Sequence, residues 1–165
     1  MITKFNNYIV ESRESLDELE MLNPEELGTL LRGEVGEQSP NIEYIKDLIA
    51  VGCPINFRGA YDWTPLQHAA QNGYLDVVKL LVSKGAGVNK KNKFTWNALQ
   101  YAAQVGDIEI VKTLLSNGAQ IDDVNSNNMT ALYIAARDGK LDIVEFLLSK
   151  GANIYIKHKV DGGTA

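Results

Sequence analysis

The sequence predicts an all-α solenoid, in which short helix pairs stack in a row and each pair buries apolar side chains against its neighbours. Within the 165 residues, one segment recurs three times at a period of 33 residues. A fixed period in this range is typical of solenoids. Inside the segment, apolar residues recur at helical spacing and glycine follows each helical run. Positions in register include Leu66, Leu99 and Leu132, and the closing pairs Gly85-Ala86, Gly118-Ala119 and Gly151-Ala152.

The first helix of each repeat is short and rich in alanine. We expect it near Pro65–Asn72 in the clearest copy, because Thr64 can cap it and proline is favoured at the first helical position. Gly73 follows, where a left-handed backbone ends the helix. The paired alanines let neighbouring helices lie close together, and larger side chains would overpack the stack. These pairs are Ala69-Ala70, Ala102-Ala103 and Ala135-Ala136.

The second helix of each repeat carries the larger apolar load. In the first clear copy, the expected inward residues are Leu75, Val78, Leu81 and Val82. Gly85 ends this helix, and the chain then extends and turns back toward the next repeat. Each repeat is therefore expected to be a helix–loop–helix followed by a β-hairpin-like loop.

The residues inside the repeat resemble those of the ankyrin repeat family. The heptapeptide that starts at Thr64, TPLQHAA, is similar to the family signature T-P-L-H-x-A-A, with Gln67 in place of the histidine. The segments Gly73–Leu81 and Gly85–Asn89 match the rest of the motif. The resemblance implies an ankyrin-repeat α-solenoid with β-hairpin loops. It divides the regular part of the chain into residues 58–90, 91–123 and 124–156.

The N-terminal part departs from this pattern. Residues 1–23 are expected to form an extension that carries an extra helix over Ser12–Met21. Residues 24–57 are expected to form a degenerate capping repeat. Asn23 and Pro24 are favourable helix-start residues, and acidic residues follow in the first turn.

Within the capping repeat, the link between its two helices is longer than in the other copies. We expect Gly33–Ser39 to be an exposed loop, and a helix over residues 40–51 to restore the register.

The last clear repeat keeps apolar residues where a terminal repeat normally becomes polar, because no neighbour covers it. Residues 157–165 then resemble the start of a further repeat or a C-terminal tail. Two explanations are open: the chain is a fragment of a longer ankyrin protein, which we favour, or a partner or another copy covers this edge. The apolar residues concerned are Leu132, Ile134, Ala135, Ala136, Ile143 and Leu147.

Charge and composition restrict the possible functions. The net charge is −5, and residues 1–57 hold 11 acidic and 4 basic side chains. This acidic segment disfavours contact with a phosphate backbone. No apolar run approaches the ~18 residues of a membrane-spanning helix, and the N-terminus has no apolar signal sequence. With a single cysteine, Cys53, these features predict a cytoplasmic protein (host cytosol if a pathogen makes it) without membrane insertion.

The resemblance implies that a partner protein binds to the hairpin tips and to exposed positions of the inner helices. Both tryptophans of the chain occupy the same position in successive repeats, and tryptophan and tyrosine are enriched in binding hot spots. Alternatively, these rings pack against neighbouring hairpins and stiffen the loops. The predicted contact residues are Tyr61, Trp63, Lys93, Phe94, Trp96, Asn127 and Met129 at the tips, and Gln71, Asn72, Gln104, Val105 and Arg137 on the inner helices.

The sequence offers no arrangement for catalysis, a metal or a cofactor. His68, His158 and Cys53 lie far apart and have no metal-ligand spacing. Lys90–Lys93 lies beside aromatic residues, as in proteins that bind single-stranded nucleic acid, but three lysines are few, and an acidic protein surface is the expected complement.

We therefore expect a non-enzymatic adaptor with a protein partner, either monomeric or weakly self-associating. The alternative is an assembly or tethering element of a longer ankyrin protein, which would associate through the uncapped C-terminal edge.

Overall fold

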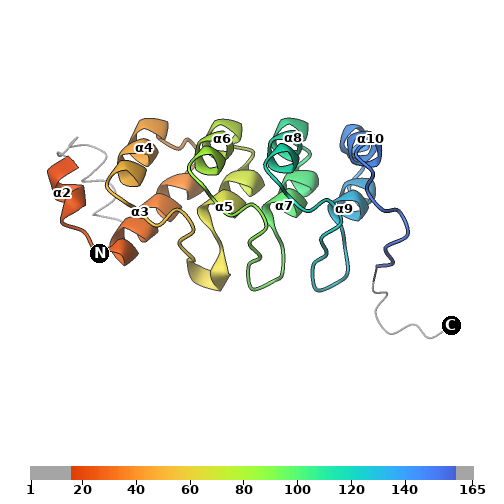
Figure 1. Ribbon diagram of the computed structural model, residues 1–165, viewed down its shortest axis with the longest axis horizontal. Coiled ribbons are helices and arrows are strands. Elements are labelled where there is room, and N and C mark those ends of the chain that lie inside the picture. The colour runs from red at the N-terminus through yellow and green to blue at the C-terminus, as the bar shows by residue number, and fades with distance from the viewer. Residues whose placement is uncertain (1–15, 159–165) are drawn as a thin grey trace.

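The computed structural model describes residues 16–158 and confirms the predicted α-solenoid (Figure 1). Short helices stand in pairs along one axis, and no strand occurs among the described residues. The elements are α2 (Leu16–Glu20), α3 (Pro24–Gly36), α4 (Ile42–Ala50), the 3-10 turn η1 (Ala60–Asp62), α5 (Pro65–Asn72), α6 (Leu75–Ser83), α7 (Ala98–Val105), α8 (Ile108–Ser116), α9 (Ala131–Arg137) and α10 (Leu141–Ser149).

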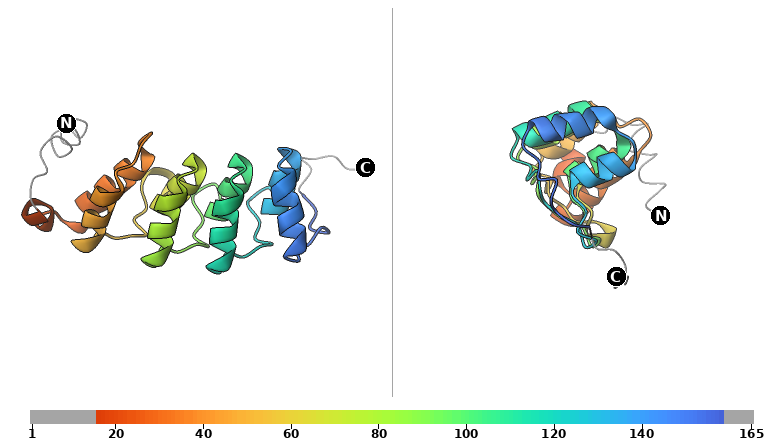
Figure 2. Two further views of the ribbon diagram at one scale, coloured as in Figure 1. Left: turned by 90° about the horizontal axis from the view of Figure 1, so that it is seen from above. Right: turned by 90° about the vertical axis from the view of Figure 1, so that its right-hand side faces the viewer.

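The helices form two layers. The inner layer contains α3, α5, α7 and α9, and the outer layer contains α4, α6, α8 and α10 (Figures 1 and 2). Each inner helix packs against its own outer helix and against the next inner helix. The loops between repeats project beyond the inner layer and lie side by side. One edge of the molecule is therefore built from loops and inner helices of successive repeats.

The inner helices begin as the sequence predicts. The Thr64 hydroxyl accepts a hydrogen bond from the Gln67 N–H, and the Gln67 side chain accepts one from the Thr64 N–H. Asn97 and Gln100 form the same reciprocal pair at the start of α7. This capping box satisfies backbone groups that would otherwise lack a partner at a helix start. Gly73 ends α5 at φ 75°, in the left-handed region where glycine has no steric penalty.

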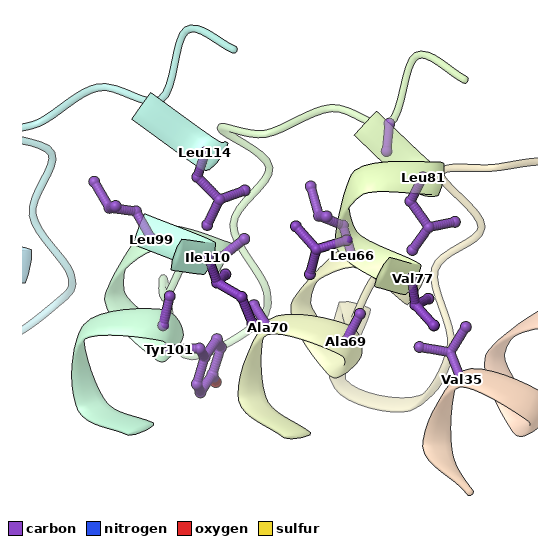
Figure 3. Packing of buried hydrophobic residues seen from close by; sticks show 14 of the residues in the cluster. Val35, Leu66, Ala69, Ala70, Val77, Leu81, Leu99, Tyr101, Ile110 and Leu114 are labelled. Atoms are coloured by element: carbon purple, nitrogen blue, oxygen red, sulfur yellow. The ribbon is translucent and has the colours of Figure 1, made fainter. Parts of the chain in front are cut away.

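Small side chains allow the close stacking. Ala69 and Ala70 of α5 are fully buried. In Figure 3, Ala69 lies toward Val35 of α3, and Ala70 lies toward Ile110 of the next repeat. The core continues from unit to unit because the leucines of α5–α8 pack between the two layers. Fully buried leucines in these helices are Leu66, Leu81, Leu99 and Leu114.

Each loop is a hairpin turn closed by the same hydrogen bond: the N–H of Gly59, Asn92 or Asn125 donates to the carbonyl four residues ahead. The turn needs a left-handed residue, and Asp62, Thr95 and Asn128 occupy it at φ 61°, 63° and 60°. A non-glycine residue in this region is strained by roughly 1–2 kcal/mol.

The N-terminal repeat corrects one prediction. Gly33–Ser39 is not all loop, because α3 continues to Gly36. Two buried side chains explain the longer helix: Val35 belongs to the core, and the Glu34 carboxylate accepts a hydrogen bond from the Asn41 N–H just before α4. Burial raises the pKa of Glu34 above its ordinary value.

The extra N-terminal helix is present as α2, which falls inside the predicted Ser12–Met21, although residues 12–15 lie outside the described part. Leu19 of α2 is buried against the stack. The predicted helix over 40–51 corresponds to α4. At the other end, residues 157–165 were predicted to be the start of a further repeat or a tail. Residues 159–165 of this segment lie outside the described part of the chain. None of the helices in residues 16–158 has the length and apolarity that crossing a bilayer requires.

Candidate interaction surface

Two aromatic rings from adjacent hairpins form an exposed pair. Tyr61 and Phe94 are 62% and 52% exposed. Their ring centroids lie 5.8 Å apart at an interplanar angle of 29°, so the rings stack on each other rather than on the core. The Lys93 ammonium lies 5.9 Å from the Tyr61 ring centroid. We call Tyr61, Phe94 and Lys93 the tip cluster.

The backbone holds the tip cluster in place. The Lys93 N–H donates to the Tyr61 carbonyl at 2.9 Å, which ties the second hairpin to the first. Within the second hairpin, the Asn92 side-chain oxygen accepts from the N–H groups of Phe94 and Trp96 at 3.0 and 3.1 Å. Tyr61 itself has a left-handed backbone at φ 58°. The two rings are therefore presented on a fixed backbone.

The tryptophans behave differently from the tip cluster. Trp63 and Trp96 are half-buried, and each packs against Tyr101 of α7, at centroid distances of 4.5 and 5.0 Å. Trp63 also lies 4.7 Å from the His68 ring. Both tryptophans were predicted as contact residues at the hairpin tips, with packing against neighbouring hairpins as the alternative, and the ring of Tyr101 contacts both of them. The tryptophans thus pack against neighbouring residues, as in the alternative given above, whereas Tyr61 and Phe94 are exposed at the hairpin tips.

The position of the tryptophans in the hairpin explains their burial. Each precedes the cap of an inner helix and packs against the fourth helical residue, His68 or Tyr101. This is the arrangement of a hydrophobic staple, which fixes the angle at which the chain enters the helix.

Met129, which was predicted as an exposed tip residue, is buried. It holds the same position as the tryptophans in the third hairpin and is only 6% exposed. Its carbonyl accepts hydrogen bonds from the Asn125 N–H and the Gln100 side chain, and its sulfur lies 3.7 Å from an Arg137 nitrogen. Met129 therefore belongs to the packing between repeats. Asn127, two residues earlier, is exposed.

The inner helices contribute a row of exposed and mostly uncharged positions beside the hairpins. Arg137 is paired with its neighbour Asp138 at 2.7 Å, so its charge is partly neutralised. Val105 is the apolar member of the row. The predicted residues that are exposed on α5, α7 and α9 are Gln71, Asn72, Gln104, Val105 and Arg137.

Sequence reasoning missed two cations next to the first hairpin. Arg58 is exposed, shortly before the tip. The Arg32 side chain crosses Gly59, where an added Cβ would lie 2.2 Å from the arginine Cδ. A glycine directly before the hairpin tip is a weak signal for such a close contact. Arg32 and Gly59 are far apart in the sequence, so local sequence patterns could not predict their contact.

Burial changes the pKa of the cysteine and of one of the two histidines. Burial raises the pKa of the Cys53 thiol to about 12, and its sulfur donates to the Leu27 carbonyl. Burial, and secondarily the Arg32 charge, lower the pKa of His68 to about 4. In residues 16–158, no group of three His, Cys, Asp or Glu side chains is placed to hold a metal ion.

Comparison with known protein families gives two matches. A model described as "Ankyrin repeats (3 copies)" matches residues 85–158, and one described as "Ankyrin repeat" matches residues 61–93. Together they span residues 61–158, which include α5 to α10 and the second and third hairpins. A comparison with curated proteins found no match.

Proposed function

Because the chain belongs to the ankyrin repeat family, whose repeats are generally protein–protein interaction modules, we propose that it is a non-enzymatic adaptor that binds a partner protein. The binding surface consists of the hairpin tips and the adjoining inner helices. The observation that supports this proposal most is the exposed pair of Tyr61 and Phe94. Two stacked aromatic rings facing water are typical of a binding hot spot, because their apolar faces gain most when a partner removes them from solvent.

The polar row beside the tip cluster completes the proposed surface. Gln71, Gln104 and Arg137 offer hydrogen-bond groups one repeat apart, so an extended partner segment could contact several repeats in turn. The hairpins are tied together through backbone bonds such as that from Lys93 to Tyr61. A pre-organised surface of this kind loses little conformational entropy on binding.

The proposal includes a cytoplasmic location. A single cysteine cannot form an internal disulfide, and the Cys53 thiol is buried and free. A free cysteine without a disulfide partner is typical of proteins in a reducing compartment.

The test is affinity capture from a lysate of the source cells, read by mass spectrometry. The wild type is compared with Tyr61→Ala/Phe94→Ala, and with Tyr155→Ala as a control that removes an exposed aromatic ring elsewhere. We expect a protein that the wild type and the control retain and that the double variant loses. Equal recovery on all three baits would contradict the proposed surface, provided that circular dichroism shows the same helix content.

One observation favours the alternative, self-association. The described residues end in a face whose apolar side chains are open to water: Leu141 is 72% and Leu148 is 44% exposed, and Ile154 is exposed as well. A second copy seated on this face would cover them, and apolar area contributes roughly 25 cal/mol per Å² buried.

Sedimentation equilibrium over a wide range of concentrations distinguishes the two proposals. An adaptor without self-association keeps the monomer mass throughout. If the face associates, the mass rises with concentration in the wild type and stays monomeric in Leu141→Glu/Leu148→Glu. The control is Met21→Glu, which changes an apolar residue near α2 that is 88% exposed and lies away from this face.

A further inference from the structure

The tip cluster lies among cations that, within the described part of the chain, form no ion pair with a carboxylate. Lys93 is part of it, Lys90 and Arg58 are exposed on the same two hairpins, and Arg32 crosses the base of the first. Within residues 16–158, none of these four lies within ion-pair distance of a carboxylate, whereas the neighbouring Lys91 is paired with Asp123 at 2.6 Å.

The charge changes sign along the row of hairpins. The first two hairpins carry the unpaired cations, with Asp62 as the exposed carboxylate beside them. The third hairpin carries Asp122 and Asp123, and the Asp122 side chain accepts a hydrogen bond from the Asn153 N–H. Along these three hairpins, the unpaired cations therefore gather on the first two, around Tyr61 and Phe94, and the exposed Lys157 follows only beyond the third.

We propose that the first two hairpins recognise an acidic segment of a partner protein. Carboxylates of the segment face Lys93, Lys90 and Arg58, and an apolar or aromatic side chain rests on the Tyr61–Phe94 pair. This inference rests on the adaptor function proposed above and adds the chemistry of the partner. Complementary charge speeds association and excludes wrong partners, while the aromatic contact supplies most of the affinity.

The same features disfavour a nucleic acid at this place. A single strand of nucleic acid needs a positive groove that follows several phosphates, with aromatic rings on which successive bases stack. Here the rings stack on each other, and residues 122–129 of the third hairpin carry no cation that would continue the positive patch. An acidic peptide needs only a short positive patch next to an apolar contact.

The test is selection from a random peptide library displayed on phage. The wild type is the target, and Tyr61→Ala/Phe94→Ala serves for counter-selection. The inference predicts that the enriched peptides are rich in Asp and Glu and contain an apolar residue. Replacing Asp and Glu by Asn and Gln in a selected synthetic peptide should weaken binding at least about tenfold, as should Lys93→Glu in the protein.

Lys150→Glu is the matched control, since Lys150 also lies near an aromatic ring, 5.5 Å from the Phe146 centroid, but on the outer layer. It makes the same change of net charge as Lys93→Glu, so an effect of overall charge would appear in both variants. Equal weakening by the two variants would overturn the inference.

Two further outcomes would also overturn it. Selected peptides that are neutral or basic but still need Tyr61 and Phe94 would reject the acidic class and leave the adaptor function in place. An oligo(dT) strand that binds more tightly than any selected peptide, and loses binding in Tyr61→Ala/Phe94→Ala, would assign the surface to nucleic acid. Absence of any enriched peptide would reject the inference, and lysate capture would then decide on the adaptor function separately.

Discussion

An inner repeat and the last described repeat have matching sequences but different surroundings. Ile108 at the start of α8 is half-buried, while Leu141 at the same place in α10 is 72% exposed. Ala103 of α7 is fully buried, and Ala136 of α9 is exposed. The difference lies in the neighbour, because a further helix pair covers α7 and α8 on their C-terminal side. In a solenoid, a residue is buried by the next unit as much as by its own.

The polar contacts between repeats show the same contrast. The buried Gln100 side chain donates to the carbonyls of Asp123 and Met129, at 3.1 and 3.0 Å. Gln67 does the same one repeat earlier. At the equivalent position of the last repeat stands Tyr133, whose ring stacks on His158 at 4.7 Å. The inner repeats are joined through amide groups, and the last one ends in a ring contact.

The largest effect is expected from breaking the amide link. Gln100→Leu removes the side-chain partner of the Asn97 N–H and of the Asp123 carbonyl, and one of the two partners of the Met129 carbonyl. Each buried group left unpaired costs about 1–3 kcal/mol. We expect the free energy of unfolding to fall by about 3 kcal/mol, measured by urea denaturation.

The control for this variant is Tyr133→Leu at the equivalent position. It removes a partly exposed ring contact worth about 0.5–1.5 kcal/mol. A loss in Gln100→Leu no larger than in Tyr133→Leu would show that the amide link adds nothing to the stack.

A second comparison tests the alanine positions. Ala103→Leu places a larger side chain where α7 meets its neighbours, and overpacking should lower the free energy of unfolding by roughly 1–3 kcal/mol. Ala136→Leu makes the same change on the exposed side of α9, where we expect less than about 0.5 kcal/mol. The shift of the melting temperature of each variant from that of the wild type measures the difference. Equal shifts would mean that the last repeat is covered in solution.

The smallest effect concerns pH. The pKa of His68 is about 4 in the folded protein and near 6.5 when unfolded. Between these values the unfolded chain binds the proton and the folded one does not, so stability is retained above pH 6.5 and falls as the pH is lowered toward 4. In His68→Gln, the free energy of unfolding should decrease less between pH 6.5 and pH 4 than in the wild type. Urea denaturation at several pH values measures this difference. An identical slope in both proteins would exclude His68 as a contributor.

The sequence predicted the solenoid because its signals are local and repeated. Caps, helix-ending glycines and alanine pairs recur at one period, and each element needs only its own residues to be recognised. Met129 was expected at an exposed tip but is buried, because the prediction treated the whole hairpin as surface. A residue just before a helix cap can pack as a hydrophobic staple, and this signal would have separated Trp63, Trp96 and Met129 from Tyr61 and Phe94.

The extension of α3 to Gly36 could not be predicted from the residues of that segment alone. Gly33 and Gly36 suggested a loop, but Val35 becomes fully buried against the stack and Glu34 bonds to the residue before α4. Burial of an apolar side chain contributes about 1.5–3 kcal/mol, and together with the Glu34 hydrogen bond it offsets the cost of two glycines in a helix, roughly 1 kcal/mol each.

The sequence by itself determined the repeat and its helices, and it predicted the positions from which a partner would be contacted. Only the tertiary structure decided which of those positions face water, because this depends on the neighbouring repeat. It also brought together Tyr61, Phe94 and the cations around them, which lie on separate hairpins and α3. Helical periodicity depends on residues within one segment of the chain. The exposure of a side chain and the clustering of charges depend on which other segments pack beside it.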